Sequence, residues 1–167
     1  MKKIKILGVD PGANRIGFGA IERNKNKTSL LEYGVIEIKS SSIKNCTTGS
    51  RLIVLEKEIS RLIKKIKPDI IGIERIYFAR NQKTAMAVSE ARGVIMLAIA
   101  KNKIPIKEYS PSTIKQRIAG HGKADKKDVL KIIKLLLKIK VFNSLDDASD
   151  ALAIALVVDL DSEEITF

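Results

Sequence analysis

The pattern of apolar and polar positions predicts strands and helices that alternate along much of the chain. Short apolar runs rich in β-branched residues, each followed by a turn signal, predict five strands, at residues 4–10, 17–22, 30–38, 69–74 and 104–109. Apolar residues at helical spacing predict helices over 51–66, 82–102, 111–118, 126–140 and 145–160. Short connections join the first three strands, which favours an antiparallel meander, whereas helices separate the later strands. We therefore expect an α/β fold with a five-stranded mixed sheet flanked by helices on both faces.

Helix-capping residues and one unusual apolar segment add detail to this picture. Ser50, Ser110 and Asp125 are the expected N-caps of three of the helices. The segment 82–102 is apolar nearly all round between Ala85 and Ala100. A helix without a polar face is buried on two sides, so we expect one side to cover the sheet and the other to meet a partner subunit.

Two of the expected strands end in an acidic residue. Asp10 closes the first strand, just before the turn signal Pro11-Gly12, and Glu74 closes the fourth. A helical crossover lets these two strands run parallel, and as neighbours they would face both acids into the crevice at their carboxyl ends. Each acid also has a purely structural interpretation, since Asp10 can bond its own turn and Glu74 can pair with Arg75.

A third acidic group lies near the start of the last helix. Asp147 and Asp150 are three residues apart and share one helix face, whereas Asp146 points elsewhere. A capping box with Ser144 explains Asp146 and Asp147, but Asp150 lies beyond the first turn beside an apolar face and needs a partner. Gathered together, the four acids would repel one another. Divalent Mg²⁺ relieves such repulsion, and two ions can clamp the attacking and leaving oxygens of a phosphodiester.

Composition and charge narrow the function class. The 167 residues form one expected domain, 1–167, whose acidic end is 157–167. A formal net charge of +12 favours a polyanionic partner, and nucleic acid is the usual one, although a general lysine bias is the alternative. The single cysteine excludes an intramolecular disulfide. No apolar run has the length of a membrane span, so we expect a cytoplasmic location without membrane partners.

Four motifs together resemble the RuvC family of Holliday-junction resolvases. They cover nearly the whole chain in the family's order: Gly8-Val9-Asp10-Pro11-Gly12, Ile73-Glu74-Arg75, Ala91-Arg92-Gly93 and Asp147-Ala148-Ser149-Asp150-Ala151-Leu152-Ala153-Ile154-Ala155. The resemblance implies an RNase H-like fold, a homodimer, and Mg²⁺-dependent paired nicks across a four-way DNA junction in recombination and repair. It also implies that Mn²⁺ can replace Mg²⁺ and that a RuvAB branch-migration complex is a partner. By position, the family's four metal-binding acids match Asp10, Glu74, Asp147 and Asp150.

The resemblance also suggests residues that contact DNA. Tyr77 matches a family aromatic that stacks on an unpaired base. Lys115 and Lys126 match basic positions near the scissile phosphate, and Lys115 can also stabilise the charge that develops there, as a catalytic residue. Arg80 and Lys123 are further expected DNA contacts. Phe78 is interpreted as a core residue, and His121 is given no catalytic role.

Three other functions are alternatives to a RuvC-like nuclease. The pattern Gly-x-Asp-x-Gly also opens sugar kinases and actin-like ATPases, but those need a second related domain and a second glycine-rich loop, which this chain lacks. The YqgF nucleases share the opening motif, whereas Ala91-Arg92-Gly93 and the final Asp-x-x-Asp favour RuvC. A DNA-binding protein without catalysis is the third alternative, and the presence of all four acids argues against it.

Overall fold

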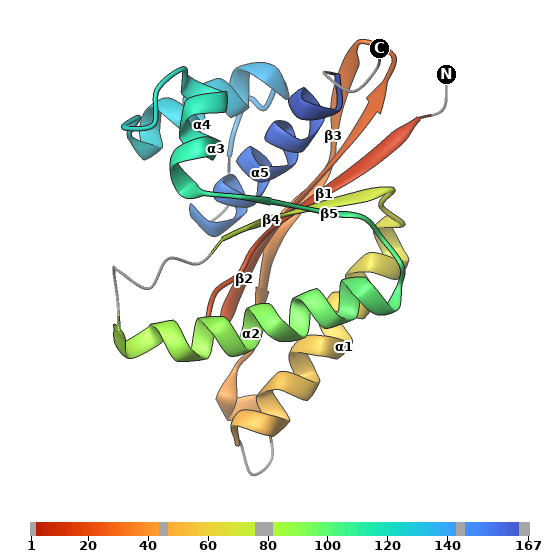
Figure 1. The fold of residues 1–167 in the computed structure, drawn as a ribbon, viewed down its shortest axis with the longest axis vertical. Helices are drawn as coiled ribbons and strands as arrows, with labels where there is room; N and C mark the ends of the chain where they lie inside the picture. Colours follow the sequence, from red (N-terminus) through yellow and green to blue (C-terminus); the bar gives the residue numbers. More distant parts are fainter. Residues whose placement is uncertain (1–2, 44–46, 76–81, 143–145, 164–167) are drawn as a thin grey trace.

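A computed structural model describes residues 3–43, 47–75, 82–142 and 146–163 as an α/β fold (Figure 1). The strands form one sheet in the order β3-β2-β1-β4-β5, with bounds β1 Ile4–Asp10, β2 Arg15–Asn24, β3 Lys27–Glu37, β4 Ile70–Glu74 and β5 Ile106–Tyr109. The helices are η1 Ser40–Ser42, α1 Thr48–Ile66, α2 Gln82–Lys101, α3 Pro111–Ala119, α4 Lys126–Leu136 and α5 Asp146–Glu163. The expected five-stranded mixed sheet is therefore confirmed.

The order and direction of the strands bring the ends of β1 and β4 together. β1, β2 and β3 form the expected antiparallel meander, and β4 runs parallel to both β1 and β5. In the ladder between β1 and β4, Val9 lies opposite Ile73. Asp10 directly follows Val9 and Glu74 directly follows Ile73, so both acids lie at the carboxyl ends of two neighbouring parallel strands.

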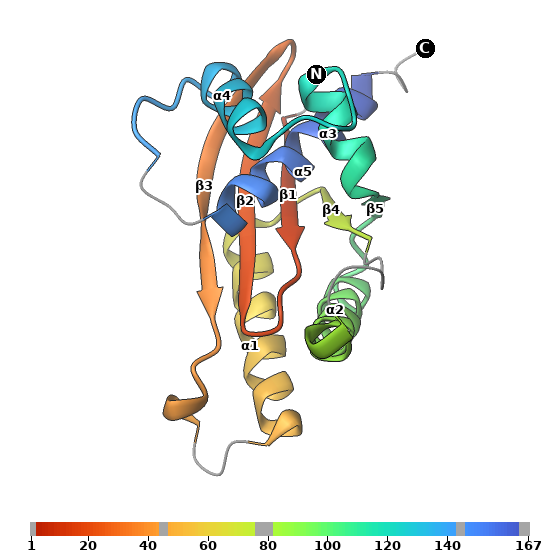
Figure 2. The ribbon, with the colours of Figure 1, turned by 90° about the vertical axis from the view of Figure 1, so that its left-hand side faces the viewer.

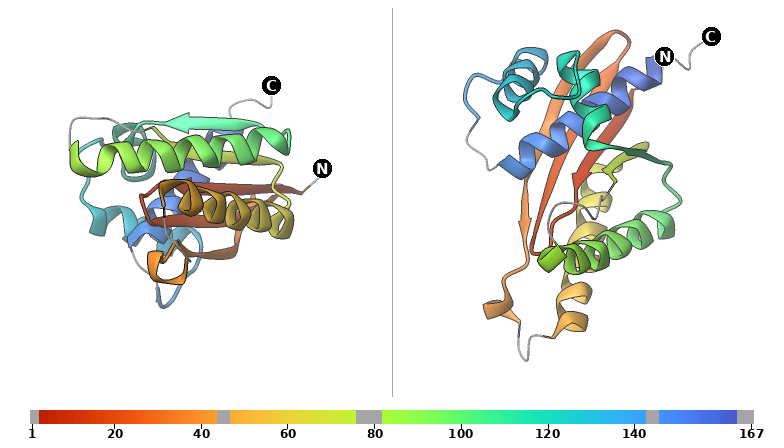
Figure 3. Two further views of the ribbon diagram at one scale, coloured as in Figure 1. Left: turned by 90° about the horizontal axis from the view of Figure 1, so that it is seen from below. Right: turned by 60° about the vertical axis from the view of Figure 1, so that its left-hand side comes forward.

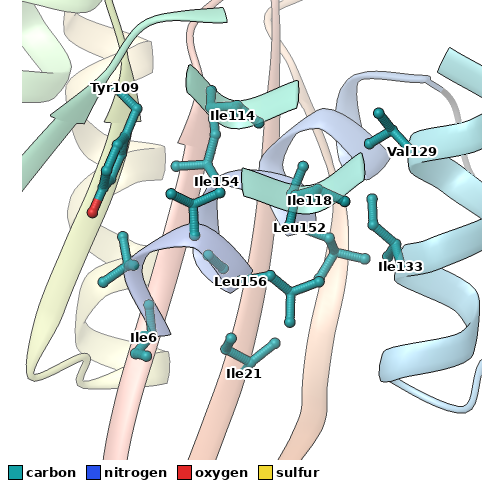
Figure 4. Packing of buried hydrophobic residues seen from close by; sticks show 14 of the residues in the cluster. Ile6, Ile21, Tyr109, Ile114, Ile118, Val129, Ile133, Leu152, Ile154 and Leu156 are labelled. Atoms are coloured by element: carbon teal, nitrogen blue, oxygen red, sulfur yellow. The ribbon is translucent and has the colours of Figure 1, made fainter. Parts of the chain in front are cut away.

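Helices cover both faces of the sheet, as expected, and divide the core in two. On one face α1 and α2 pack against strand residues such as Leu7, Val9 and Ile71. On the other face α3, α4 and α5 pack over Ile6 and Ile21 (Figures 2 and 4). Adjacent strand residues such as Ile6 and Leu7 thus enter different cores, because side chains alternate across a strand. Figure 3 shows the sheet between these two helical layers.

The ends of several elements differ from expectation. The N-cap of α1 is Thr47 and not Ser50; Ser50 instead occupies the third helical position and completes a reciprocal capping box with Thr47. Ser110 and Asp125 cap α3 and α4 as predicted. Helix α4 ends at Leu136 and does not continue to residue 140, because Lys138 adopts a left-handed backbone with φ of 54°.

Helix α5 lies unusually close to the backbone of the sheet. Gly19, Gly8 and Gly72 are direct neighbours across β2, β1 and β4, and they form a row under the helix. A Cβ atom on Gly8 would lie 2.0 Å from the carbonyl oxygen of Ala151, and one on Gly72 would lie 2.6 Å from the Val158 side chain. Only glycine fits beneath the helix at these positions, so the row sets how deeply α5 sits.

Among the described residues, no helix has both the length and the apolar character that crossing a membrane requires.

Candidate active site: acidic residues at the ends of β1, β4 and α5

Four acidic side chains converge where β1 and β4 end. Asp10 and Glu74 close the two parallel strands. Gly17 lies opposite Asp10 in β2, and a Cβ atom on Gly17 would lie 1.9 Å from the main-chain oxygen of Asp147. The first turn of α5 therefore rests over the β2 neighbour of Asp10. One helical turn further on, Asp150 follows on the same helix face.

Burial and mutual repulsion change the protonation of the two strand-end acids. The pKa of Asp10 is raised to about 8, mainly by burial and further by the charges of Glu74, Asp150 and Asp147. Burial also raises the pKa of Glu74, followed by the charge of Asp150, although a hydrogen bond from Asp10 opposes the rise. Asp10 therefore holds its proton more firmly than a free carboxyl group does, and it is the donor in its hydrogen bond to Glu74.

The two acids of α5 are paired with cations. Lys126 Nζ lies 3.0 Å from Asp150 Oδ2, which supplies the partner that the sequence required for this acid. Burial lowers the pKa of Lys126, but the hydrogen bond and charge of Asp150 outweigh it and the net pKa is raised. Arg15 Nη2 lies 3.0 Å from Asp147 Oδ2. Arg15 was missed by sequence reasoning, and its position at the start of β2, directly after the turn that follows Asp10, is the signal that points to it.

The remaining sequence-predicted residues fall into two groups. Lys115 on α3 lies near the acids, since its charge lowers the pKa of Glu74, while Lys123 is exposed in the connection between α3 and α4. Tyr77 and Arg80 lie outside the described residues, as does Phe78. The described chain thus gathers six of the expected site residues at one edge of the sheet: Asp10, Glu74, Asp147, Asp150, Lys115 and Lys126.

The donor set fits a hard divalent cation in its chemistry. Carboxylate oxygens are the ligands that Mg²⁺ and Mn²⁺ prefer. After burial, repulsion from neighbouring carboxylates raises the pKa values of Asp10 and Glu74, and a bound cation would relieve that repulsion. As they stand, no three such side chains among the described residues are arranged to hold a metal ion. Asp147 and Asp150 form ion pairs with Arg15 and Lys126, and Asp10 is hydrogen-bonded to Glu74. Metal binding therefore requires these side chains to turn away from their present partners.

The chain matches one family model along most of its length, and the description of that model is "Crossover junction endodeoxyribonuclease RuvC", matched by residues 6–158. A relative so named from Petrotoga mobilis is 44% identical over 150 residues, which cover 90% of each chain. Another from Caldicellulosiruptor saccharolyticus is 39% identical over 165 residues, covering 98% of this chain and 97% of the relative.

Solved structures agree with these sequence relatives. The structure of Thermus thermophilus RuvC is similar with a TM-score of 0.83 at 25% identity, covering 96% of both chains. The same protein in complex with a Holliday junction substrate gives a TM-score of 0.86, again at 25% identity and 96% coverage of both chains. The five-stranded mixed sheet is thus that of an RNase H-like fold.

We predict that Asp10→Asn stabilises the metal-free protein at neutral and alkaline pH. The folded state raises the pKa of Asp10 from 3.8 to about 8, so it binds this proton more tightly than the unfolded chain does. Its contribution to stability therefore falls as pH rises from about 4 to about 8, by at most about 1.4 kcal/mol per pH unit, and an amide removes that fall.

Urea denaturation in chelator at pH 5, 7 and 8.5 measures this difference. The stability advantage of Asp10→Asn over the wild type should grow with pH, whereas the control Asp146→Asn, at an exposed acid of the same region, should show no such growth. An advantage for the wild type at every pH, or a difference independent of pH, would contradict the assignment.

Proposed function

The chain belongs to the RuvC family of crossover junction endodeoxyribonucleases, and from that premise we propose that it resolves four-way DNA (Holliday) junctions in recombination and repair. The observation that carries the proposal is the convergence of four carboxylates from β1, β4 and α5 in a chain that is otherwise strongly basic. Relatives across 90% or more of this chain are named as such nucleases, and the similar T. thermophilus protein was solved with a Holliday junction substrate.

We propose Mg²⁺ as the cofactor, two ions per subunit during hydrolysis, with Mn²⁺ able to replace it. Asp10, Glu74, Asp147 and Asp150 would hold the metal. When bound, divalent metal activates the attacking water and neutralises charge on the scissile phosphate. Beside a bound cation the pKa of Asp10 would fall, because the positive charge would favour its carboxylate form and offset the burial and repulsion that raise the pKa.

The cations beside the acids suit a phosphate substrate. Lys126 and Arg15 pair with Asp150 and Asp147; if those carboxylates held metal, both cations would be free to bind phosphates that flank the scissile bond. The charge of Lys115 acts on Glu74, where it lowers the pKa, and the same charge would stabilise negative charge that develops during hydrolysis. Lys123, Tyr77 and Arg80 stay proposed DNA contacts, the aromatic as a platform for an unpaired base.

Helix α2 supports the proposal of a homodimer. Its outer side exposes two large apolar side chains, Met86 with 74% and Leu97 with 53% of its surface accessible. Between them Gly93 has open space in the direction of a side chain, so another backbone can approach closely there. A dimer suits two symmetric nicks in one junction. We propose that this dimer acts in the cytoplasm and receives its junctions from a RuvAB branch-migration complex.

Cleavage of a synthetic four-way junction tests the function directly. The wild type should cleave it with Mg²⁺ or Mn²⁺, act much more weakly on linear duplex of the same sequence, and stop in chelator. Asp10→Asn should lose more than about 100-fold in rate, since it removes a metal ligand, while Asp146→Asn should retain activity.

Junction binding by the Asp10→Asn variant separates catalysis from recognition. Binding should persist and weaken steeply with salt, because phosphate contacts dominate such affinity. Tight wild-type binding without cleavage in either metal would identify a binding protein and overturn the nuclease. Retained cleavage by Asp10→Asn would remove Asp10 from the site.

Sedimentation at micromolar concentration tests the dimer. We expect a wild-type dimer that Leu97→Glu converts to monomer, because a buried charge at the interface lacks a partner. Leu135→Glu, at another exposed leucine, on α4 and with 76% of its surface accessible, is the control and should stay dimeric. A wild-type monomer, or a dimer unaffected by Leu97→Glu, would exclude the α2 interface.

A further inference from the structure

Asp10 and Glu74 are not held together by the sheet itself. The ladder between β1 and β4 has Val9 opposite Ile73 as its last pair among the described residues. Asp10 is held by its pairing with Gly17 on one side, and Glu74 by its pairing with Tyr109 on the other. The two half-buried acids therefore lie just beyond the backbone hydrogen bonds that β1 and β4 share. Apart from the side-chain hydrogen bond between them, contacts from outside the sheet can set the separation of the segments that carry them.

One such contact comes from Arg92 on α2. Its Nε donates a hydrogen bond to the main-chain oxygen of Glu74 at 3.3 Å, and its Nη2 forms an ion pair with Glu108 on β5. Glu108 lies opposite Ile73, the residue just before Glu74. A single guanidinium thus holds the end of β4 and its neighbouring strand to the helix. Sequence reasoning used Arg92 only as part of a family motif and gave it no chemical role.

A second arginine makes the matching contact on the side of Asp10. Arg51 of α1 is buried, and its Nη1 donates to the main-chain oxygen of Ala13, in the turn that follows Asp10. Its Nη2 forms an ion pair with Glu90 Oε2 at 3.2 Å. Glu90 and Arg92 belong to the same turn of α2. The chain segments that carry Asp10 and Glu74 are therefore both tied to one short stretch of this helix.

The chemistry of arginine suits such a role. Its planar guanidinium offers several donors in fixed directions, so it can hold a carbonyl and a carboxylate at the same time. Both arginines face away from solvent over most of their side chains, with 10% of Arg51 and 21% of Arg92 accessible. Near the site, Arg92 contacts the main-chain oxygen of Glu74 and Arg51 that of Ala13, and the ion pairs of the two arginines are with Glu108 and Glu90 and not with the Asp10 or Glu74 side chains. The two arginines can therefore affect the positions of the Asp10 and Glu74 carboxylates through the main chain.

We propose that Arg51 and Arg92 are positioning residues, which set the separation of Asp10 and Glu74 from one turn of α2 and so determine how well these acids bind metal. The inference rests on the proposed metal-dependent function and extends it to residues that touch neither metal nor DNA. Outer contacts of this kind change metal affinity or activity by about 10- to 100-fold when removed.

The test compares Arg92→Met and Arg51→Met with a matched control on the same helices. Lys101→Met removes the ion pair between Lys101 on α2 and Glu56 on α1, at 3.2 Å, which lies at the carboxyl end of α2, beyond the turn that holds Glu90 and Arg92. Calorimetric titration with Mn²⁺ in the absence of DNA measures metal affinity without reference to activity. Single-turnover cleavage over a range of Mg²⁺ concentrations and junction affinity in chelator complete the comparison.

Arg92→Met and Arg51→Met should each bind Mn²⁺ about 10- to 100-fold more weakly than wild type and need more Mg²⁺ for half-maximal cleavage. Junction affinity should stay within about twofold, since neither residue is a proposed DNA contact, and Lys101→Met should match the wild type throughout. Arg92→Lys keeps the charge but reaches one partner at a time, so its Mn²⁺ affinity should lie between those of Arg92→Met and wild type. This variant also decides the question if Arg92→Met does not fold.

Wild-type Mn²⁺ affinity in Arg92→Lys and in whichever methionine variants fold would overturn the proposal. So would a loss of junction affinity equal to the loss of cleavage rate, which would make the arginines DNA contacts. A wild-type protein that does not bind Mn²⁺ would overturn it as well. If the wild type binds Mn²⁺ but does not cleave junctions, the proposed function fails, and the Mn²⁺ titrations still decide the role of the arginines.

Discussion

The contact between α5 and the row of glycines in β2, β1 and β4 is the constraint on which the site depends. With hydrogen atoms in place of side chains at Gly19, Gly8 and Gly72, the helix lies directly on the strand backbones. The face of α5 that contacts the strands carries small side chains, among them the fully buried Ala151 and Ala155. Close packing of this kind is intolerant of added volume, so the depth and direction of the helix are fixed. The first turn of α5 is thereby held beside the end of β1.

Bringing the acids together has an energetic cost that the rest of the molecule offsets. Burial and repulsion raise the pKa of Asp10 and of Glu74, so the ionised site destabilises the metal-free fold. Arg15 and Lys126 neutralise the two acids on α5. Arg51 and Arg92, from the helical layer on the other face of the sheet, contact main-chain oxygens beside the site. The site is thus positioned from both faces of the sheet, by α5 on one face and by α2 on the other. The hydrophobic cores on both faces hold these helices in place.

Much of this architecture is predictable from sequence because its signals are local. A β-branched run that ends in an acid and a turn signal identified the ends of β1 and β4, and an acid beside an apolar helix face showed that Asp150 needs a partner. The row of glycines was missed because it depends on how the strands are paired. Gly8 and Gly72 are separated by more than sixty positions, and only strand pairing shows that they lie side by side. The cap of α1 at Thr47 was missed because serine, as at Ser50, is the more favoured N-cap residue.

The stability of Gly8→Ala compared with Gly49→Ala tests the central claim most directly. A methyl group at Gly8 would meet the Ala151 carbonyl at 2.0 Å, whereas one at Gly49, in the first turn of α1, would find its nearest neighbour 3.9 Å away. Urea denaturation should show a loss of at least about 2 kcal/mol for Gly8→Ala and no loss for Gly49→Ala. Equal stabilities of the two variants would contradict the account, since α5 would then not lie against the glycine row.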